Sequence, residues 1–70
     1  MNTVKISYII ITWNGLSFIR NLLSSMLHQL EREDVEVIIV DNHSTDGTLE
    51  FLQQSYPSTE LVCLPENKGV

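Results

Sequence analysis

Residues 35–48 read Val-Glu-Val-Ile-Ile-Val-Asp-Asn-His-Ser-Thr-Asp-Gly-Thr, and this stretch decides the fold. Its first six residues are almost all apolar and β-branched, a pattern typical of a strand buried on both faces. The polar run 41–47 that follows is rich in helix-capping residues, so a helix is expected to begin at Thr48. A buried strand, a polar loop and a helix in this order indicate a parallel α/β sheet.

The segment upstream predicts another strand and helix. Val4–Ile11 is a β-branched run that begins by alternating and ends continuously apolar. The Asn14-Gly15 pair after it is a hairpin signal. Apolar residues then recur at helical spacing, which favours a helix over 16–30 instead of a hairpin. The recurring residues are Ile19, Leu22, Leu23, Met26, Leu27 and Leu30.

The downstream segment completes the unit. Thr48–Ser55 is predicted to be a short helix with Leu52 turned inward, and Pro57 ends it because a proline disfavours helical backbone before it. Leu61–Leu64 is predicted to be the third strand. The result is an α/β fold, a parallel β-α-β-α-β unit with strand order 3-2-1 and both helices on one face.

Size and composition suit a part of a larger sheet. A chain of 70 residues buries only about 60% of its unfolded surface, so its stability alone is marginal. Its hydrophobic residues, 43% of the total, lie in a few dense runs. The first strand would also be an unpaired edge. Residues 1–70 are therefore expected to be the N-terminal portion of a single domain.

Charge and cysteine content exclude several classes of function. A net charge of −5 argues against binding nucleic acid or an anionic membrane. Cys63 is the only cysteine, so there is no disulfide framework, and it is expected to be a core thiol. Apolar runs such as Tyr8–Ile11 are too short to cross a bilayer. We expect a cytoplasmic protein, with peripheral attachment to the inner face of the membrane left to segments outside this chain.

Three polar segments, 12–15, 41–47 and 66–69, follow the three strands. Ligands of open α/β sheets bind outside the carboxyl ends of the strands, so a site is expected there. In the first segment, the indole of Trp13 could stack on a base or a sugar, or it could simply cap the sheet. Asn14 beside it could equally be a turn former.

The second polar segment is the most informative. Asp41 and Asn42 directly follow an apolar strand, so their side chains should leave the core at the ligand edge. There a carboxylate can accept a hydrogen bond from the imino group of a pyrimidine. A simple turn and capping role would explain Ser44, Asp46 and Gly47, because such residues satisfy free N–H groups at a helix start. It would not explain two adjacent polar residues after the strand.

Other ligand-binding motifs are absent from the sequence. Neither a Gly-x-Gly-x-x-Gly loop nor a Gly-x-x-x-x-Gly-Lys-Ser/Thr loop occurs. Residues 42–47 look like half of a calcium loop, but the twelfth position is Gln53 instead of glutamate. No metal site is expected within the chain.

Three segments, 6–15, 37–48 and 66–70, together resemble the family-2 glycosyltransferases. The resemblance covers nearly the whole chain. The family usually has Thr-Tyr-Asn in the first motif, where this chain has Trp13 in the middle position. The Asp41-Asn42 pair is similar to that of a rhamnosyltransferase-like subgroup.

The resemblance implies the GT-A fold, a Rossmann-like fold that binds nucleotide-diphosphate sugars. It implies transfer of a hexosyl or deoxyhexosyl unit to a hydroxyl of a glycan or lipid-linked acceptor in polysaccharide synthesis, with Mg²⁺ or Mn²⁺. Residues at the matching motif positions would bind the nucleotide: Thr12, Trp13, Asn14, Asp41, Asn42, Ser44, Asn67 and Gly69. Of these, Asp41 and Asn42 would meet the base edge.

The resemblance also implies that the chemistry lies elsewhere. The family's metal-binding Asp-x-Asp and its catalytic base follow later strands, so no residue of 1–70 is assigned a catalytic or metal-binding role. In such enzymes a carboxylate deprotonates the acceptor hydroxyl, and the metal stabilises the departing diphosphate. Residues 1–70 alone are expected to be inactive and to contribute positioning only.

Three alternatives stay open at this point. A non-catalytic α/β nucleotide-binding or regulatory module, such as a receiver-like domain, would need an acidic cluster after the first strand, where this chain has Thr12-Trp13-Asn14. A nucleotidyltransferase would need a basic, glycine-rich loop there. The third alternative is a degenerate product without activity. An Asp-x-Asp after a fourth strand would favour the glycosyltransferase.

Overall fold

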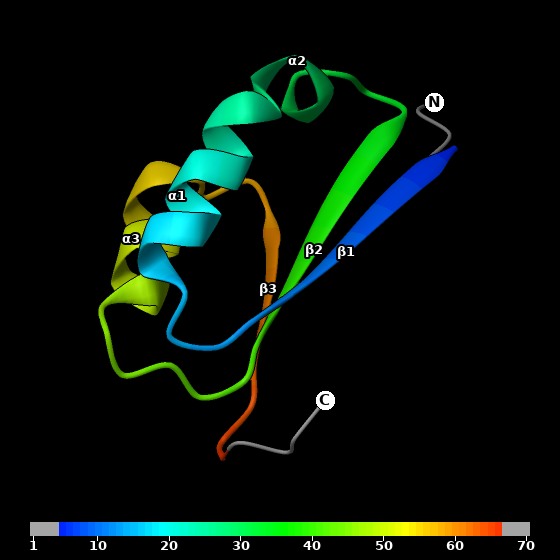
Figure 1. Ribbon diagram of the computed structural model, residues 1–70. Coiled ribbons are helices and arrows are strands. Elements are labelled where there is room, and N and C mark those ends of the chain that lie inside the picture. Colours follow the sequence, from blue (N-terminus) through cyan, green and yellow to red (C-terminus); the bar gives the residue numbers. More distant parts are fainter. Residues whose placement is uncertain (1–4, 67–70) are drawn as a thin grey trace.

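Three parallel strands and three helices make up the structure, a computed structural model that describes residues 5–66 (Figure 1). In chain order the elements are β1 (Ile6–Thr12), α1 (Leu16–Ser25), α2 (Leu27–Leu30), β2 (Val35–Asp41), α3 (Thr48–Ser55) and β3 (Glu60–Cys63). The predicted alternation of strands and helices is confirmed.

The central strand of the sheet is β2, which pairs in parallel with both β1 and β3. The order β1-β2-β3 is the predicted order 3-2-1 read from the opposite edge of the sheet. The register places Ile39 of β2 between Ile10 of β1 and Leu61 of β3. Side chains of these three residues therefore share one face of the sheet.

Helices α1 and α3 cover that face together, as predicted (Figure 1). The core consists of two side chains from α1, two from β2 and one from α3: Ile19, Leu23, Val37, Ile39 and Leu52. The two helices also meet through Arg20, whose guanidinium lies 5.2 Å from the centre of the Phe51 ring. Burial of this apolar layer is the main source of stability in such a unit.

The other face of the sheet is open within residues 5–66, since both long helices lie on the first face (Figure 1). The continuously apolar run in β1 predicts a strand buried on both faces, and this prediction is wrong. Ile9 and Ile11 on the open face are 65% and 49% exposed, and Ile6 and Tyr8 on the other face are 38% and 36% exposed. The prediction that Cys63 is a core thiol is wrong. Its side chain is exposed because β3 is an edge strand and Cys63 is its last residue.

The helix predicted over 16–30 is interrupted at Met26, so the prediction of one continuous helix is wrong. Met26 adopts φ −105° and ψ 13°, and its N–H donates to the carbonyl of Leu23, three residues back, instead of four. The Ser25 hydroxyl donates to the Leu22 carbonyl at 2.6 Å, and such a side-chain bond competes with the helical ladder. The apolar spacing continues across the break, so periodicity alone does not reveal it.

The remaining boundaries differ little from the prediction. Helix α3 has the predicted ends, and it begins after Gly47, whose φ of 89° is a left-handed conformation that favours glycine. Strand β3 starts and ends one residue earlier than predicted. Strand β1 continues through Thr12, which brings the first site residue into the sheet. Val4, the predicted start of that strand, lies outside the described residues.

Candidate functional site

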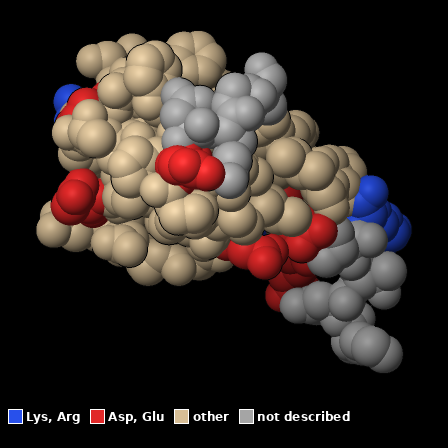
Figure 2. All heavy atoms as spheres, turned by 90° about the horizontal axis from the view of Figure 1, so that it is seen from below, with Lys and Arg blue, Asp and Glu red and all other residues tan. Residues whose placement is uncertain are grey.

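The carboxyl ends of the three strands lie at one edge of the sheet, as expected for parallel strands (Figure 1). Figure 2 views the molecule from that side. Acidic side chains occur at several separate places on this face, whereas Lys and Arg side chains occur only at its margins. The edge itself therefore offers an anionic ligand little positive charge from the described residues.

Thr12 and Asp41 are the last residues of β1 and β2 and are partners in the sheet register. Immediately beyond them, the Asn42 N–H donates to the Thr12 carbonyl at 2.8 Å. All three residues are buried, with exposed fractions of 5%, 0% and 3%. The Leu64 N–H donates to the Asp41 carbonyl at 2.9 Å, so the segment after β3 starts beside them. The structure thus brings these predicted residues together.

Asp41 holds the loop after β2. One of its carboxylate oxygens accepts the Ser44 hydroxyl at 2.6 Å, and the other accepts the Ser44 N–H at 2.8 Å. A side chain that bonds to its own backbone a few residues on is a common way for aspartate to shape a turn. The turn role therefore extends to Asp41, which the sequence alone did not suggest.

Asn14 and Ser44, both predicted to bind the nucleotide, join the first loop to the second. The Asn14 N–H donates to the Ser44 hydroxyl oxygen at 2.8 Å, and the Asn14 side-chain oxygen accepts the Thr45 N–H at 2.7 Å. Asn14 has a φ of 47°, a conformation that asparagine tolerates better than most residues. Two loops distant in sequence are thereby held side by side.

Asp46 adds a further link between these loops. The sequence predicted its bond to the start of the following helix but not its bond to the earlier one. One oxygen accepts the N–H and the hydroxyl of Thr48 at the start of α3, as helix capping predicts. The other accepts the Leu16 N–H at the start of α1, 3.1 Å away. The Thr48 hydroxyl, followed by the Leu16 and Thr48 N–H groups, lowers the pKa of Asp46 below its usual value, so it is ionised at neutral pH.

Trp13 differs from its neighbours because its side chain is 55% exposed. It lies between Thr12, which is fixed in the sheet, and Asn14, which is fixed to the second loop. An exposed indole on a loop held at both sides is suited to stacking on a flat ligand.

His43 also adopts a left-handed backbone, with a φ of 66°, and its side chain is exposed. A residue with a Cβ atom pays about 1–2 kcal/mol for this conformation, and glycine does not. We expect His43→Gly to raise the free energy of unfolding by about 0.5–1 kcal/mol, since part of the gain is lost to the flexibility of unfolded glycine. Urea denaturation of the full-length protein measures this, and His43→Ala, which keeps the Cβ, should bring no gain. Lower stability of the glycine variant would contradict the expectation.

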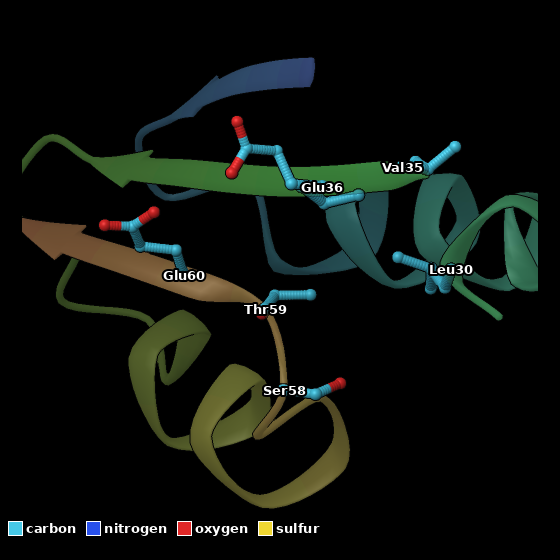
Figure 3. A pocket seen from close by; sticks show the side chains of 7 residues that line it. Leu30, Val35, Glu36, Ser58, Thr59 and Glu60 are labelled. Atoms are coloured by element: carbon cyan, nitrogen blue, oxygen red, sulfur yellow. The ribbon is translucent and has the colours of Figure 1, made fainter. Parts of the chain in front are cut away.

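The residues of the structure do not form a metal site. Within residues 5–66, no three His, Cys, Asp or Glu side chains are grouped so that they could hold a metal ion. Two hollows among the described residues are lined by other side chains than those of the predicted site. Figure 3 shows the first, of about 250 Å³, at the amino ends of β2 and β3, where Leu30, Val35 and Thr59 line it. The second lies between α3 and β3.

Two of the predicted site residues, Asn67 and Gly69, lie outside the described residues. The other six lie at the carboxyl edge. Five of these six have their backbone or side chain engaged in contacts that join the strand ends and loops, and Trp13 is presented to solvent. A parallel α/β sheet with its polar loops clustered at this edge defines a Rossmann-like fold, a class in which ligands bind at the carboxyl ends of the strands.

Comparison with known proteins identifies the family. A sequence model of glycosyl transferase family 2 matches residues 7–70, so the chain belongs to that family. It is 38% identical over 64 residues to a poly(ribitol-phosphate) beta-glucosyltransferase of Bacillus spizizenii, covering 90% of this chain and 10% of that protein. It is 36% identical over 69 residues to the uncharacterized glycosyltransferase YfnE of Bacillus subtilis, covering 96% of this chain and 18% of that protein.

A solved structure shares the fold. The chain superimposes on a mannosyltransferase from Pyrobaculum calidifontis in complex with GDP-Man and Mn²⁺ with a TM-score of 0.75 and 27% sequence identity. The match covers 97% of this chain and 21% of the mannosyltransferase. The expected GT-A fold is thereby confirmed. In the described part of the chain, no helix has the length and apolar character needed to cross a membrane.

Proposed function

We propose that the full-length protein transfers a sugar from a nucleotide-diphosphate sugar to an acceptor hydroxyl, and that this segment binds the donor nucleotide. The observation that carries the proposal is the exposed indole of Trp13 at the carboxyl edge, on a loop tied to the loop after β2. Family membership and the GDP-Man bound by the related mannosyltransferase support it.

The contacts suggest a role for each residue of the proposed site. Trp13 stacks on the base or ribose, while Asp41 and Asn42, at the carboxyl end of β2, meet the base edge. Thr12, Asn14 and Ser44 belong to the same proposed site and hold its loops, and Asn67 and Gly69 extend it on the nucleotide side. Since the described edge is poor in basic groups, the charge of the diphosphate is countered by a divalent cation and by parts of the protein outside this segment.

The transfer chemistry belongs to those other parts as well. The chain spans between a tenth and a fifth of the curated relatives that it matches. The metal-binding and acceptor-activating groups are proposed to lie in the remainder, with Mg²⁺ or Mn²⁺ as the ion; the Mn²⁺ of the related mannosyltransferase supports this choice. A hexosyl or deoxyhexosyl unit is passed to a glycan or lipid-linked acceptor in the cytoplasm or at the inner face of the membrane. The poly(ribitol-phosphate) glucosyltransferase relative supports a role in cell-surface polysaccharide synthesis.

Trp13 provides the direct test of nucleotide binding. Trp13→Leu in the full-length protein should weaken binding of a nucleoside diphosphate by about 1–3 kcal/mol, the usual contribution of a base stacked on an aromatic ring. Trp13→Phe, which keeps a ring, should lose less than half of that. Calorimetry with guanosine, uridine and thymidine diphosphates measures both variants and identifies the preferred base. Equal affinity in the wild type and both variants would leave Trp13 as a cap on the sheet.

A non-catalytic nucleotide-binding module is the alternative function. It has the same nucleotide affinity but no turnover, so an assay of the full-length protein with a panel of nucleotide sugars separates the two. Residues 1–70 alone should give no transfer in that assay under either function, because the metal-binding and acceptor-activating groups are proposed to lie in the remainder of the protein. Turnover by the short chain would show that the catalytic groups have been misplaced.

A further inference from the structure

Asp46 joins the starts of two helices at this edge of the molecule. Its carboxylate accepts from the first N–H of α1, on Leu16, and from the first N–H and side chain of α3, on Thr48. One side chain thus caps two helices that belong to different crossovers of the sheet. A carboxylate at two helix starts is stabilised by both helix dipoles and by charge-assisted hydrogen bonds.

The link to Leu16 determines where the first loop ends. That loop comprises residues 13–15 and carries the exposed Trp13. Its first end is fixed by the sheet pairing of Thr12, and its middle by the bond of Asn14 to the second loop. Its last end is fixed by the bond from Leu16 to Asp46. Without this last bond, that end is held by the packing of α1 alone.

A direct role for Asp46 in binding the donor is disfavoured by its bonding and by its charge. Its carboxylate already accepts three hydrogen bonds from the two helix starts, from the Leu16 N–H and from the N–H and hydroxyl of Thr48. Its pKa is lowered, so the group carries a negative charge that would repel a diphosphate. We therefore expect its influence on a nucleotide to pass through the loop that it holds.

We propose that Asp46 is a positioning residue for donor binding. By tying the start of α1 to the start of α3, it fixes the position of the Trp13 indole. The proposal rests on the proposed function of this edge as the nucleotide site. It differs from an ordinary capping role in one measurable respect: a cap adds stability whatever residue occupies position 13, whereas a positioning residue affects binding only while Trp13 is present.

A double-mutant cycle on the full-length protein tests this difference. Asp46→Asn should weaken binding of the preferred nucleoside diphosphate by about 5–10-fold when Trp13 is present, because one acceptor and the charge are lost. In the Trp13→Leu background, the same change should weaken binding by less than about twofold, since there is no indole left to position. Calorimetry gives the four affinities, and thermal melts confirm that each variant is folded.

Glu50→Gln is the matched control, because Glu50 is an exposed acid in the first turn of α3 and its replacement removes the same charge. Its nucleotide affinity should equal that of the wild type. Should Asp46→Asn fail to fold, Asp46→Ser replaces it in the cycle. The serine keeps one oxygen for Thr48 but cannot reach both helices.

Each result decides a separate question. An equal loss from Asp46→Asn in both backgrounds, or no loss in either, overturns the positioning role and leaves Asp46 as a cap. A normal affinity of Trp13→Leu itself instead overturns the proposed nucleotide contact. Coupling between the two positions, with an unchanged Glu50→Gln, supports the proposal.

Discussion

Replacing Ile39 by alanine is expected to lower the free energy of unfolding by about 2–5 kcal/mol, the range for truncating a fully buried aliphatic side chain. Ile39 has an exposed fraction of 0% and lies on the central strand, between Ile10 and Leu61 in the register. It belongs to the same cluster as the buried residues of α1 and α3, so a cavity left by the truncation would be surrounded by the sheet and by both helices. The packed neighbours can close it only in part.

Ile39→Val is the matched comparison and should cost about 0.5–1.5 kcal/mol, because it removes one methylene group from the same place. Urea denaturation of the full-length protein, followed by circular dichroism, gives both values. Nucleotide affinity should be unchanged in the folded fraction, since the residue lies two positions before the site. If the two variants were equally stable, Ile39 would not be in the core that these contacts define.

Asp41→Ala is expected to weaken binding of a nucleoside diphosphate by about 1–3 kcal/mol, the cost of leaving a buried partner without its hydrogen bond. The structure adds a second expected loss. The Ser44 N–H and hydroxyl both donate to this carboxylate, so the free energy of unfolding should fall by about 1–3 kcal/mol as well. Calorimetry and urea denaturation of the full-length protein measure the two losses separately.

Ser44→Ala separates the two ways in which Asp41 could act. It removes the 2.6 Å hydroxyl bond to Asp41, together with the acceptor of the Asn14 N–H, and leaves the carboxylate in place. An equal loss of affinity in both variants would mean that the loop contacts made through the Ser44 hydroxyl account for the effect of Asp41. A loss confined to Asp41→Ala would indicate direct contact with the base, and unchanged affinity in both variants would contradict a role in nucleotide binding.

Most of the fold could be predicted because it depends on patterns that local physics enforces. The apolar run that became β2 and the helix α3 are cases in which composition and capping residues agree. The break at Met26 could not be predicted, because the side chains on both sides keep the helical period while Ser25 takes a carbonyl from the ladder. The exposure of Cys63 depends on its place at the edge of the sheet, which the residues around it do not reveal.

The candidate site was predicted as a location, and its internal contacts were not. Parallel topology alone requires the strand ends, and with them Thr12 and Asp41, to meet at one edge. The bonds of Asn14 to Ser44 and of Leu16 to Asp46 span 30 residues of sequence each. No local pattern encodes such pairs, because their partners become neighbours only after the sheet has formed.

The sequence by itself therefore determined the order of the elements, the parallel sheet and the edge at which a ligand would bind. These follow from the spacing of apolar residues and from the handedness of crossover connections, which act within short segments. The tertiary structure alone decided the role of each polar side chain at that edge. It buried Asp41, exposed Trp13 and gave Asp46 two helices to cap, because hydrogen bonding depends on which loops packing brings within about 3 Å of each other.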